Sequence, residues 1–280
     1  WMPSRRSRGT RRPPKICVSS SDKNQRGMER LLDASGWTDK GPVRADNEDR
    51  FAVDLQTGLL VVADGMGGHN AGEVAAQLAV EAIAEVVAGG KDDGAWPFGY
   101  DQRQSRPANL LRTACEVANR RVFDAAASRA AYAGMGTTVV AALVHQDGVT
   151  VAHVGDSRAY LVRRGQAQAL TTDHSWWQEA FGAESAPVGA GALDHPMRHA
   201  LTRVVGLAPQ VDVEVRDYPL EAGDLLLLTS DGVHGAIDVA PALDAQPARA
   251  TLEELAGALV RQAVAEGSRD NCTAVVGCRT

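Results

Sequence analysis

The chain has 280 residues, 44% of them hydrophobic, and a formal net charge of −6. A chain of this length can bury a substantial core, and one domain of about 250 residues is within the usual range. The charge is uneven, because residues 1–27 carry +7 and the rest of the chain carries −13. An acidic body argues against nucleic acid as the main partner, since phosphate backbones attract Lys and Arg.

Residues 1–27 combine basic charge with Pro, Ser and Gly and offer little apolar surface to bury. This composition predicts a disordered arm. Arg5 and Arg6 resemble a twin-arginine export signal, but no apolar segment follows them, which argues against that interpretation. The folded domain is therefore expected to comprise residues 28–280.

The four cysteines form no CxxC pair and have no His partner at the spacing of a zinc finger. This pattern argues against a zinc site and favours a reduced protein in the cytoplasm. No apolar run approaches the roughly 20 residues that span a bilayer. We therefore expect no membrane insertion, and we expect a monomer.

In the first half of the chain, hydrophobic periodicity predicts two strands followed by two helices. Residues 50–55 and 59–63 flank a Gln-Thr-Gly turn and are typical of paired strands. The pattern of residues 71–88 predicts a helix, and a second helix is expected over residues 108–128. The segment between these helices, residues 89–107, has the composition of a loop.

The second half of the chain is dominated by strand patterns. Six more strands are expected, at residues 137–145, 149–154, 159–162, 211–215, 224–230 and 272–277, with a helix over about 251–265. Several are joined by short turns, so neighbouring strands should pair antiparallel. Helices outside and antiparallel strands inside predict two sheets packed face to face and covered by helices.

Four aspartates stand where apolar strand patterns end or begin: Asp64, Asp156, Asp231 and Asp270. Glycine flanks three of them and lets the backbone turn tightly or approach a ligand closely. Clustered carboxylates repel one another, so a cation is needed to hold them together. Oxygen ligands of this kind suit Mg²⁺ or Mn²⁺, which predicts a metal-dependent hydrolase.

The segment RADNED, residues 44–49, mixes a guanidinium with adjacent carboxylates. Arg44 is suited to binding phosphate oxygens, and Glu48 and Asp49 to orienting metal-bound waters. A solvated charged turn is the alternative for this segment taken alone. The Gly-rich segment after Asp64 is not a phosphate-binding P-loop, because it lacks the Lys-Ser/Thr pair, and His69 within it is more often a structural residue than a ligand.

Taken together, these segments closely resemble the metal-dependent serine/threonine protein phosphatases of the type 2C (PPM) family, especially its compact bacterial members. The resemblance extends from about residue 35 to the end of the chain. The matching segments occur in family order: RADNED (44–49), ADGMGGHNAGE (63–73), GMGTTV (134–139), HVGDSRAYL (153–161), LTTDHS (170–175), HPMRHALTRVVG (195–206), LLLTSDGV (226–233) and SRDNCTAVV (268–276).

The resemblance implies an α+β fold, a four-layer α/β/β/α sandwich with a binuclear Mn²⁺ or Mg²⁺ centre at one edge. It assigns Asp64 as the ligand that bridges both ions and the Gly65 carbonyl as a ligand of one. Asp231 and Asp270 complete the core ligands. Asp156 would join Asp231 at a weaker third ion.

The resemblance also assigns roles outside the metal ligands. Glu48 and Asp49 would act through metal-bound waters, Arg44 would hold the substrate phosphate, and residues 173–197 would form a flap beside the site. Many eukaryotic members carry a His, proposed as a general acid, where this chain has Met66. The identity of a proton donor is therefore left open. The Trp176-Trp177 pair in the flap is interpreted as packing, with substrate contact as the alternative.

The sequence thus predicts a phosphatase that hydrolyses phosphoserine and phosphothreonine in proteins with a metal-activated water, and that reverses the action of a serine/threonine kinase. Its expected partners are phosphorylated proteins and that kinase. One alternative is a phosphatase-like regulatory or binding module that has lost turnover, although all the metal carboxylates are present. A second alternative is a metal-dependent phosphohydrolase that acts on small molecules.

Overall fold

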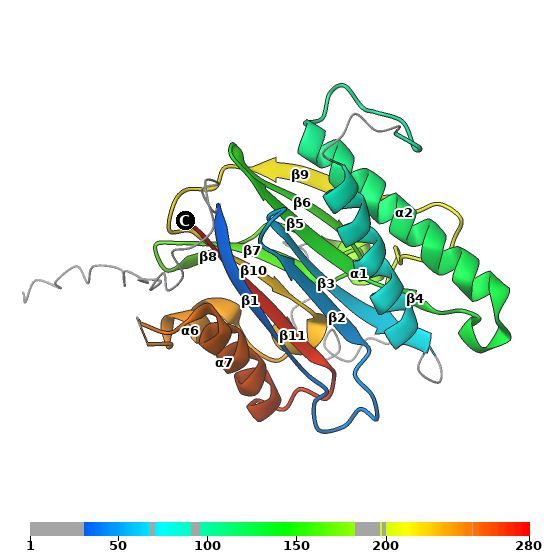
Figure 1. The fold of residues 1–280 in the computed structure, drawn as a ribbon. Helices are drawn as coiled ribbons and strands as arrows, with labels where there is room; N and C mark the ends of the chain where they lie inside the picture. The colour runs from blue at the N-terminus through cyan, green and yellow to red at the C-terminus, as the bar shows by residue number, and fades with distance from the viewer. Residues whose placement is uncertain (1–30, 68–70, 91–95, 183–196, 198–199, 248) are drawn as a thin grey trace, which may run out of the picture.

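The computed structural model describes residues 31–67, 71–90, 96–182, 197, 200–247 and 249–280. Two antiparallel sheets pack face to face, with helices on both outer faces (Figure 1). The predicted four-layer α/β/β/α sandwich is therefore confirmed. The predicted N-terminal arm lies outside the described residues.

One sheet has five strands and includes both ends of the described chain. Its order is β1 (Leu32–Asp39), β11 (Cys272–Arg279), β10 (Leu225–Thr229), β7 (Arg158–Arg163) and β8 (Gln166–Ala169). All neighbouring strands in this order pair antiparallel. The first and last strands of the fold thus lie side by side.

The second sheet has six strands. Its order is β2 (Asp49–Asp54), β3 (Leu59–Met66), β5 (Val139–His145), β6 (Gly148–Val154) and β9 (Glu214–Tyr218), and β4 (Gly136–Thr137) pairs with the end of β3. The hairpins predicted around Gly58 and Gly148 are both present.

The long helices α1 (Ala71–Gly89) and α2 (Arg106–Ser128) cover the six-stranded sheet, whereas α7 (Leu252–Ala265) and the short α6 (Val239–Asp244) cover the other (Figure 1). Ser105 caps α2, and a reciprocal capping box between Thr251 and Glu254 begins α7. The part of the chain that the structure describes also contains three short helical elements: η1 (Ala130–Tyr132), α3 (Trp176–Phe181) and α5 (Asp231–His234). No helix among the described residues combines the length and apolar character needed to cross a bilayer.

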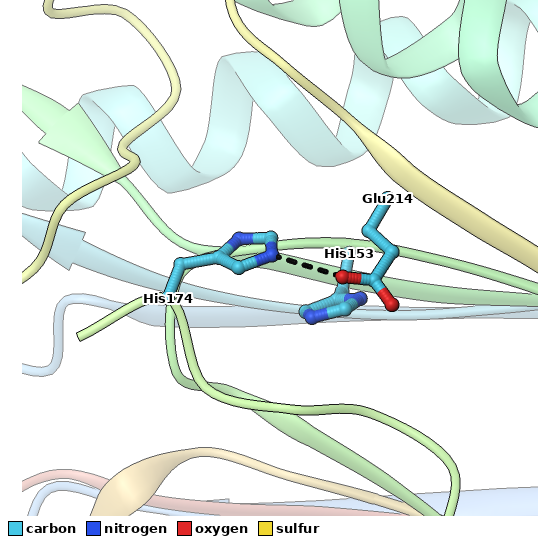
Figure 2. A group of neighbouring side chains, drawn as sticks. All are labelled: His153, His174 and Glu214. Atoms are coloured by element: carbon cyan, nitrogen blue, oxygen red, sulfur yellow. Dashed lines mark hydrogen bonds and ion pairs between the residues drawn. The ribbon is translucent and has the colours of Figure 1, made fainter. Parts of the chain in front are cut away.

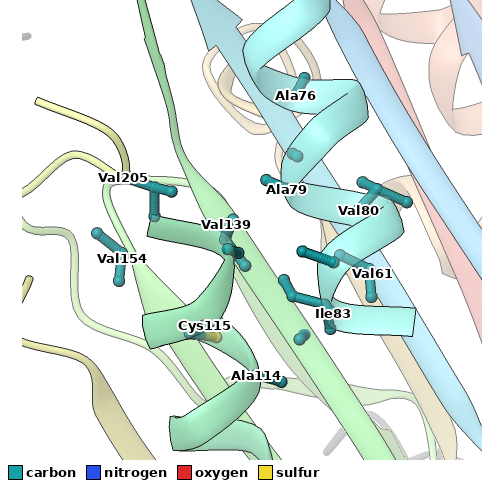
Figure 3. Close-up of a cluster of buried hydrophobic side chains, with 14 of the residues drawn as sticks. Val61, Ala76, Ala79, Val80, Ile83, Ala114, Cys115, Val139, Val154 and Val205 are labelled. Atoms are coloured by element: carbon teal, nitrogen blue, oxygen red, sulfur yellow. The ribbon is translucent and has the colours of Figure 1, made fainter. Parts of the chain in front are cut away.

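Strand β3 shows how the apolar runs are used. Val61 points into the core beneath α1 and α2 (Figure 3), and Leu59 belongs to the same core, whereas Leu60 and Val62 point into the core between the sheets. Because side chains alternate along a strand, a strand buried on both faces is apolar at every position. The doubly buried run ends at Ala63, and Asp64 follows it as the first charged residue of β3.

Several elements differ from the predictions. Strand β1 was not predicted, because its sequence LDASGWTD has no alternation, and it is held by eight paired positions on β11. Strand β9 begins at Glu214 instead of residue 211, since Val211 and Val213 pack on the helix-covered core without joining the strand ladder. Strand β8 and the short helices were also missed, because so few residues show no periodicity.

Candidate metal centre

The strand ends bring the predicted carboxylates to one edge of the sandwich. Asp49 begins β2 and lies opposite Asp64 on β3. From the other sheet, Asp231 follows β10 at the start of α5, and Asp270 precedes β11. Asp156 follows β6 after a Gly155 that adopts a positive φ of 102°.

The charges of these aspartates interact with one another. Burial raises the pKa of Asp64 well above its ordinary value, and the carboxylates of Asp49, Asp231, Asp156 and Asp270 raise it further. Burial, together with the charges of Asp231 and Asp270, raises the pKa of Asp49 to about 7, against the hydrogen bonds that it accepts. Burial and the charge of Asp231 raise the pKa of Asp156 to about 7. Mutual repulsion of this kind is relieved by a bound cation.

Asp49 gives the most direct evidence that the cluster suits a cation. Its side chain is fully buried, and Oδ2 accepts hydrogen bonds from Ser230 Oγ at 2.8 Å and Thr273 Oγ1 at 2.6 Å. Oδ1 is also buried but has no hydrogen-bond partner among the described residues. Leaving a charged oxygen buried without a partner is costly. A group of oxygen donors that includes a buried carboxylate oxygen without a hydrogen-bond partner fits a hard divalent cation.

Gly65 lies where no side chain fits. A Cβ atom there would stand 2.0 Å from the Gly72 carbonyl oxygen and 2.8 Å from the Glu48 carbonyl oxygen. The Gly65 N–H donates to the Glu48 carbonyl at 3.2 Å. The close contact therefore requires glycine and fixes the backbone beside Asp64.

Glu48 and Arg44 border the cluster on the RADNED segment. Burial raises the pKa of Glu48, while a hydrogen bond from the Gly72 backbone and the charge of Arg44 oppose that rise. Arg44 is half exposed and donates from Nη2 to Asp270 Oδ2 at 2.6 Å. Arg44 therefore lies at the border between the carboxylate cluster and solvent.

Asn271 organises this border, a role that the sequence reasoning missed. Its Oδ1 accepts from the Glu48 N–H at 2.8 Å, and its Nδ2 donates to the carbonyls of Lys40 at 2.8 Å and Asp46 at 3.0 Å. The available signal was its position directly after Asp270 in the SRDNCTAVV segment. Asn271 thus ties the segment that carries Arg44 and Glu48 to the start of β11.

A second group of possible ligands, His153, His174 and Glu214, lies between β6 and β9 (Figure 2). The Gly155 N–H donates to His174 Nδ1 at 3.2 Å, and His174 Nε2 lies 3.5 Å from Glu214 Oε2 and 3.3 Å from Arg203 Nη1. Nδ1 is thus occupied by an N–H donor, and the positively charged guanidinium of Arg203 beside Nε2 disfavours a metal ion at that position. Nε2 of His153 faces the Thr172 carbonyl at 2.8 Å, and the two rings stack at 4.4 Å.

This histidine pair therefore anchors the polypeptide that leads into the predicted flap. His69, the other histidine considered from the sequence, lies outside the described residues. Asp173, at the start of the flap, forms a two-point ion pair with Arg158 at 2.7 and 2.8 Å. Trp177 packs on Phe181 with ring centroids 4.7 Å apart. Residues 183–196 of the flap lie outside the described residues.

The raised pKa values predict that the metal-free protein loses stability as pH rises from about 6.5 to 8. Asp49 and Asp156, with folded pKa values of about 7 against 3.8, keep protons that the unfolded chain releases, so their contribution to stability is lost as pH rises through 7. Burial lowers the pKa of His145, His153 and His234 below 6.5 and that of His174 to about 4, which gives an opposite slope that fades as pH rises above 6.5. Asp64, whose pKa is raised well above its ordinary value, adds to the loss of stability over the whole range.

Thermal melts in chelator at pH 6.5, 7.25 and 8 measure this effect. The melting temperature should fall across the series, and Asp49→Asn should flatten the fall because it removes one of the responsible groups. A melting temperature that rises with pH in chelator would contradict the electrostatics of the cluster.

Comparison with known proteins gives a consistent result. Residues 43–266 match the family described as protein phosphatase 2C. The serine/threonine phosphatase stp of Listeria innocua is 34% identical over 245 residues, which cover 85% of this chain and 92% of the relative. The PPM Ser-Thr phosphatase MsPP from Mycobacterium smegmatis has a similar structure, with a TM-score of 0.72, 30% identity, and coverage of 90% of this chain and 100% of that one.

A further solved structure bears on the metal. The catalytic domain of the serine threonine protein phosphatase PstP, solved in complex with two manganese ions, is 31% identical with a TM-score of 0.69. The match covers 88% of this chain and 97% of that domain.

Proposed function

The chain belongs to the protein phosphatase 2C family of serine/threonine phosphatases, and we propose that its carboxylate cluster is the site of that activity. The observation that carries the proposal is Asp49, whose buried Oδ1 lacks a hydrogen-bond partner among the described residues within a group of mutually repelling carboxylates. The substrates are proteins phosphorylated on Ser or Thr. A serine/threonine kinase that phosphorylates them is the proposed counterpart.

We further propose that the centre holds two Mn²⁺ or Mg²⁺ ions. Asp64, the Gly65 carbonyl, Asp231 and Asp270 would hold them, and Asp156 with Asp231 would hold a weaker third. When bound, such ions supply Lewis-acid activation of water and neutralise charge on the phosphoryl group. The buried carboxylates that repel one another without a cation, and the manganese in the related PstP domain, support this assignment.

The remaining residues act on the substrate and on the shape of the site. Arg44 is exposed enough to turn its guanidinium from Asp270 to an incoming phosphate, and its planar fork suits two phosphate oxygens. Glu48 borders the cluster and Asp49 is buried within it, and both would orient groups around the cations. The three described cysteines are free and buried, which supports the proposed cytoplasmic location.

Direct assay separates this function from its two alternatives. The protein should hydrolyse a phosphothreonine peptide with Mn²⁺, lose the activity after chelation, and act far more slowly on nucleotides and sugar phosphates. Faster turnover of the small molecules would favour the small-molecule phosphohydrolase. No turnover of any substrate, with Mn²⁺ still bound in calorimetry, would favour the regulatory module.

Arg44→Ala should raise KM for the phosphopeptide more than it lowers kcat. The substitution removes the guanidinium that receives the phosphate but leaves the proposed cation ligands in place. Steady-state kinetics at saturating Mn²⁺ measure the separate effects on KM and kcat. Arg120→Ala is the matched control, because Arg120 pairs with Asp124 on the exposed face of α2. A collapse of kcat at unchanged KM would contradict a role in substrate capture.

A further inference from the structure

A ring of hydrogen bonds begins and ends at Asp49 and joins the two sheets. Asp49 belongs to β2 of the six-stranded sheet, whereas Thr38 on β1 and Thr273 on β11 lie opposite each other in the five-stranded sheet. Thr273 Oγ1 lies 2.6 Å from Asp49 Oδ2 and 2.7 Å from Thr38 Oγ1. Asn47 Nδ2 reaches Thr38 Oγ1 at 2.9 Å.

The direction of every bond in the ring follows from chemistry. The Asp49 N–H donates to Asn47 Oδ1 at 3.1 Å, which fixes the orientation of the Asn47 amide, so Nδ2 must face Thr38. With Asp49 ionised, the carboxylate can only accept, so the Thr273 hydroxyl donates its single proton to Asp49 Oδ2 and the Thr38 hydroxyl must donate to Thr273 Oγ1. Thr38 Oγ1 in turn accepts from Asn47, and hydrogen bonds aligned in one direction strengthen one another.

A second hydroxyl holds the same oxygen. Ser230 Oγ donates to Asp49 Oδ2 at 2.8 Å and itself accepts from the Thr273 N–H at 3.0 Å. Two donors therefore converge on Oδ2, whereas Oδ1 has no hydrogen-bond partner among the described residues. This asymmetry distinguishes the two oxygens of a carboxylate that would otherwise be equivalent.

We propose that Thr273 and Thr38 are positioning residues, which act through this ring to hold Asp49 with Oδ1 turned toward the cation position. The inference rests on the proposed function. Ligands and nearby groups in metal sites owe their orientation to such outer hydrogen bonds, whose loss typically weakens metal binding by about 10- to 100-fold. Thr38 is only partly buried, so the ring extends the control of Asp49 to the edge of the domain.

Calorimetry of Mn²⁺ binding to chelator-stripped protein tests the proposal without relying on activity. Thr273→Val keeps the shape but deletes the hydroxyl, and should raise the Kd for Mn²⁺ about 10-fold. Thr38→Val should raise it less, because the Thr273 hydroxyl remains. Thr273→Ser should restore the Kd of the unmodified protein. For Thr273→Val and Thr38→Val, kcat at saturating Mn²⁺ should return to that of the unmodified protein. The Mn²⁺ concentration that gives half of this activity should remain higher than in the unmodified protein.

Thr113→Val is the matched control. Thr113 is 5% exposed on α2, and its hydroxyl bonds to no described residue, so the same substitution should leave Mn²⁺ binding unchanged. In an Asp49→Asn background, Thr273→Val and Thr38→Val should have no further effect on the Kd, since both are proposed to act through Asp49. If Thr273→Val does not fold, the partly exposed Thr38 carries the test.

The outcomes separate the two proposals. An unchanged Kd in Thr38→Val and Thr273→Val, an equal rise in Thr113→Val, or an undiminished effect in Asp49→Asn would overturn the positioning role. Those results would leave the phosphatase assignment intact as long as the unmodified protein binds Mn²⁺ and hydrolyses the peptide. Absence of both in the unmodified protein would overturn the proposed function itself.

Discussion

Asp64→Asn should lower kcat/KM for a phosphothreonine peptide by more than about 100-fold, a loss of about 3 kcal/mol in transition-state stabilisation. Asp64 feels the charge of every other carboxylate in the cluster. Removal of one negative charge at this position should therefore weaken cation binding strongly. Steady-state assays with saturating Mn²⁺ measure the loss, and calorimetry should show weaker Mn²⁺ binding.

The same substitution should stabilise the metal-free protein, because it relieves repulsion inside the cluster. A higher melting temperature in chelator, together with lost activity, would separate a chemical role from misfolding. Asp124→Asn on the exposed face of α2 is the matched control and should change neither quantity. Near-normal turnover by Asp64→Asn with Mn²⁺ would refute the assignment of Asp64.

Gly65→Ala should cost at least about 10-fold in activity and several degrees in melting temperature. The new methyl group would stand 2.0 Å from the Gly72 carbonyl oxygen. A Cβ atom is fixed to its own backbone and the carbonyl is part of the backbone, so neither group can rotate away. Overpacking of this kind typically costs about 1–3 kcal/mol. The strain would act on the carbonyl proposed as a ligand, so Mn²⁺ binding should also weaken in calorimetry.

Gly89→Ala provides the comparison for this substitution. Gly89 ends α1, and a Cβ there meets no atom within 4 Å, so alanine should leave activity unchanged and slightly raise the melting temperature. Equal behaviour of Gly65→Ala and Gly89→Ala would show that the close contact with Gly72 is not needed for the site.

Much of the fold could be predicted because its signals are local. The apolar run of β3 and the Gln-Thr-Gly turn before it are visible within a few residues, as are the length of α1 and the caps of α7. Strand β1 could not be predicted in this way. Its Gly36 accommodates the ring of Phe51, and its backbone order comes from β11, which is more than 230 residues away.

The sequence by itself determined the chemistry of the site. Asp64, Asp156, Asp231 and Asp270 each follow or precede an apolar strand pattern, and the order of strands and turns delivers such residues to a sheet edge whatever the details of packing. The oxygen-only character of the donors and the preference for a hard divalent cation follow from residue type alone.

The tertiary structure decided how each donor is held. The hydroxyls that orient Asp49 come from positions 181 and 224 residues away, and the register of two packed sheets brings them together. It also assigned His153 and His174 to anchoring the start of the flap, because His174 Nδ1 accepts from the Gly155 N–H and His153 Nε2 lies 2.8 Å from the Thr172 carbonyl. No local pattern records these contacts, since they depend on which strands pair, in which register, and across which face.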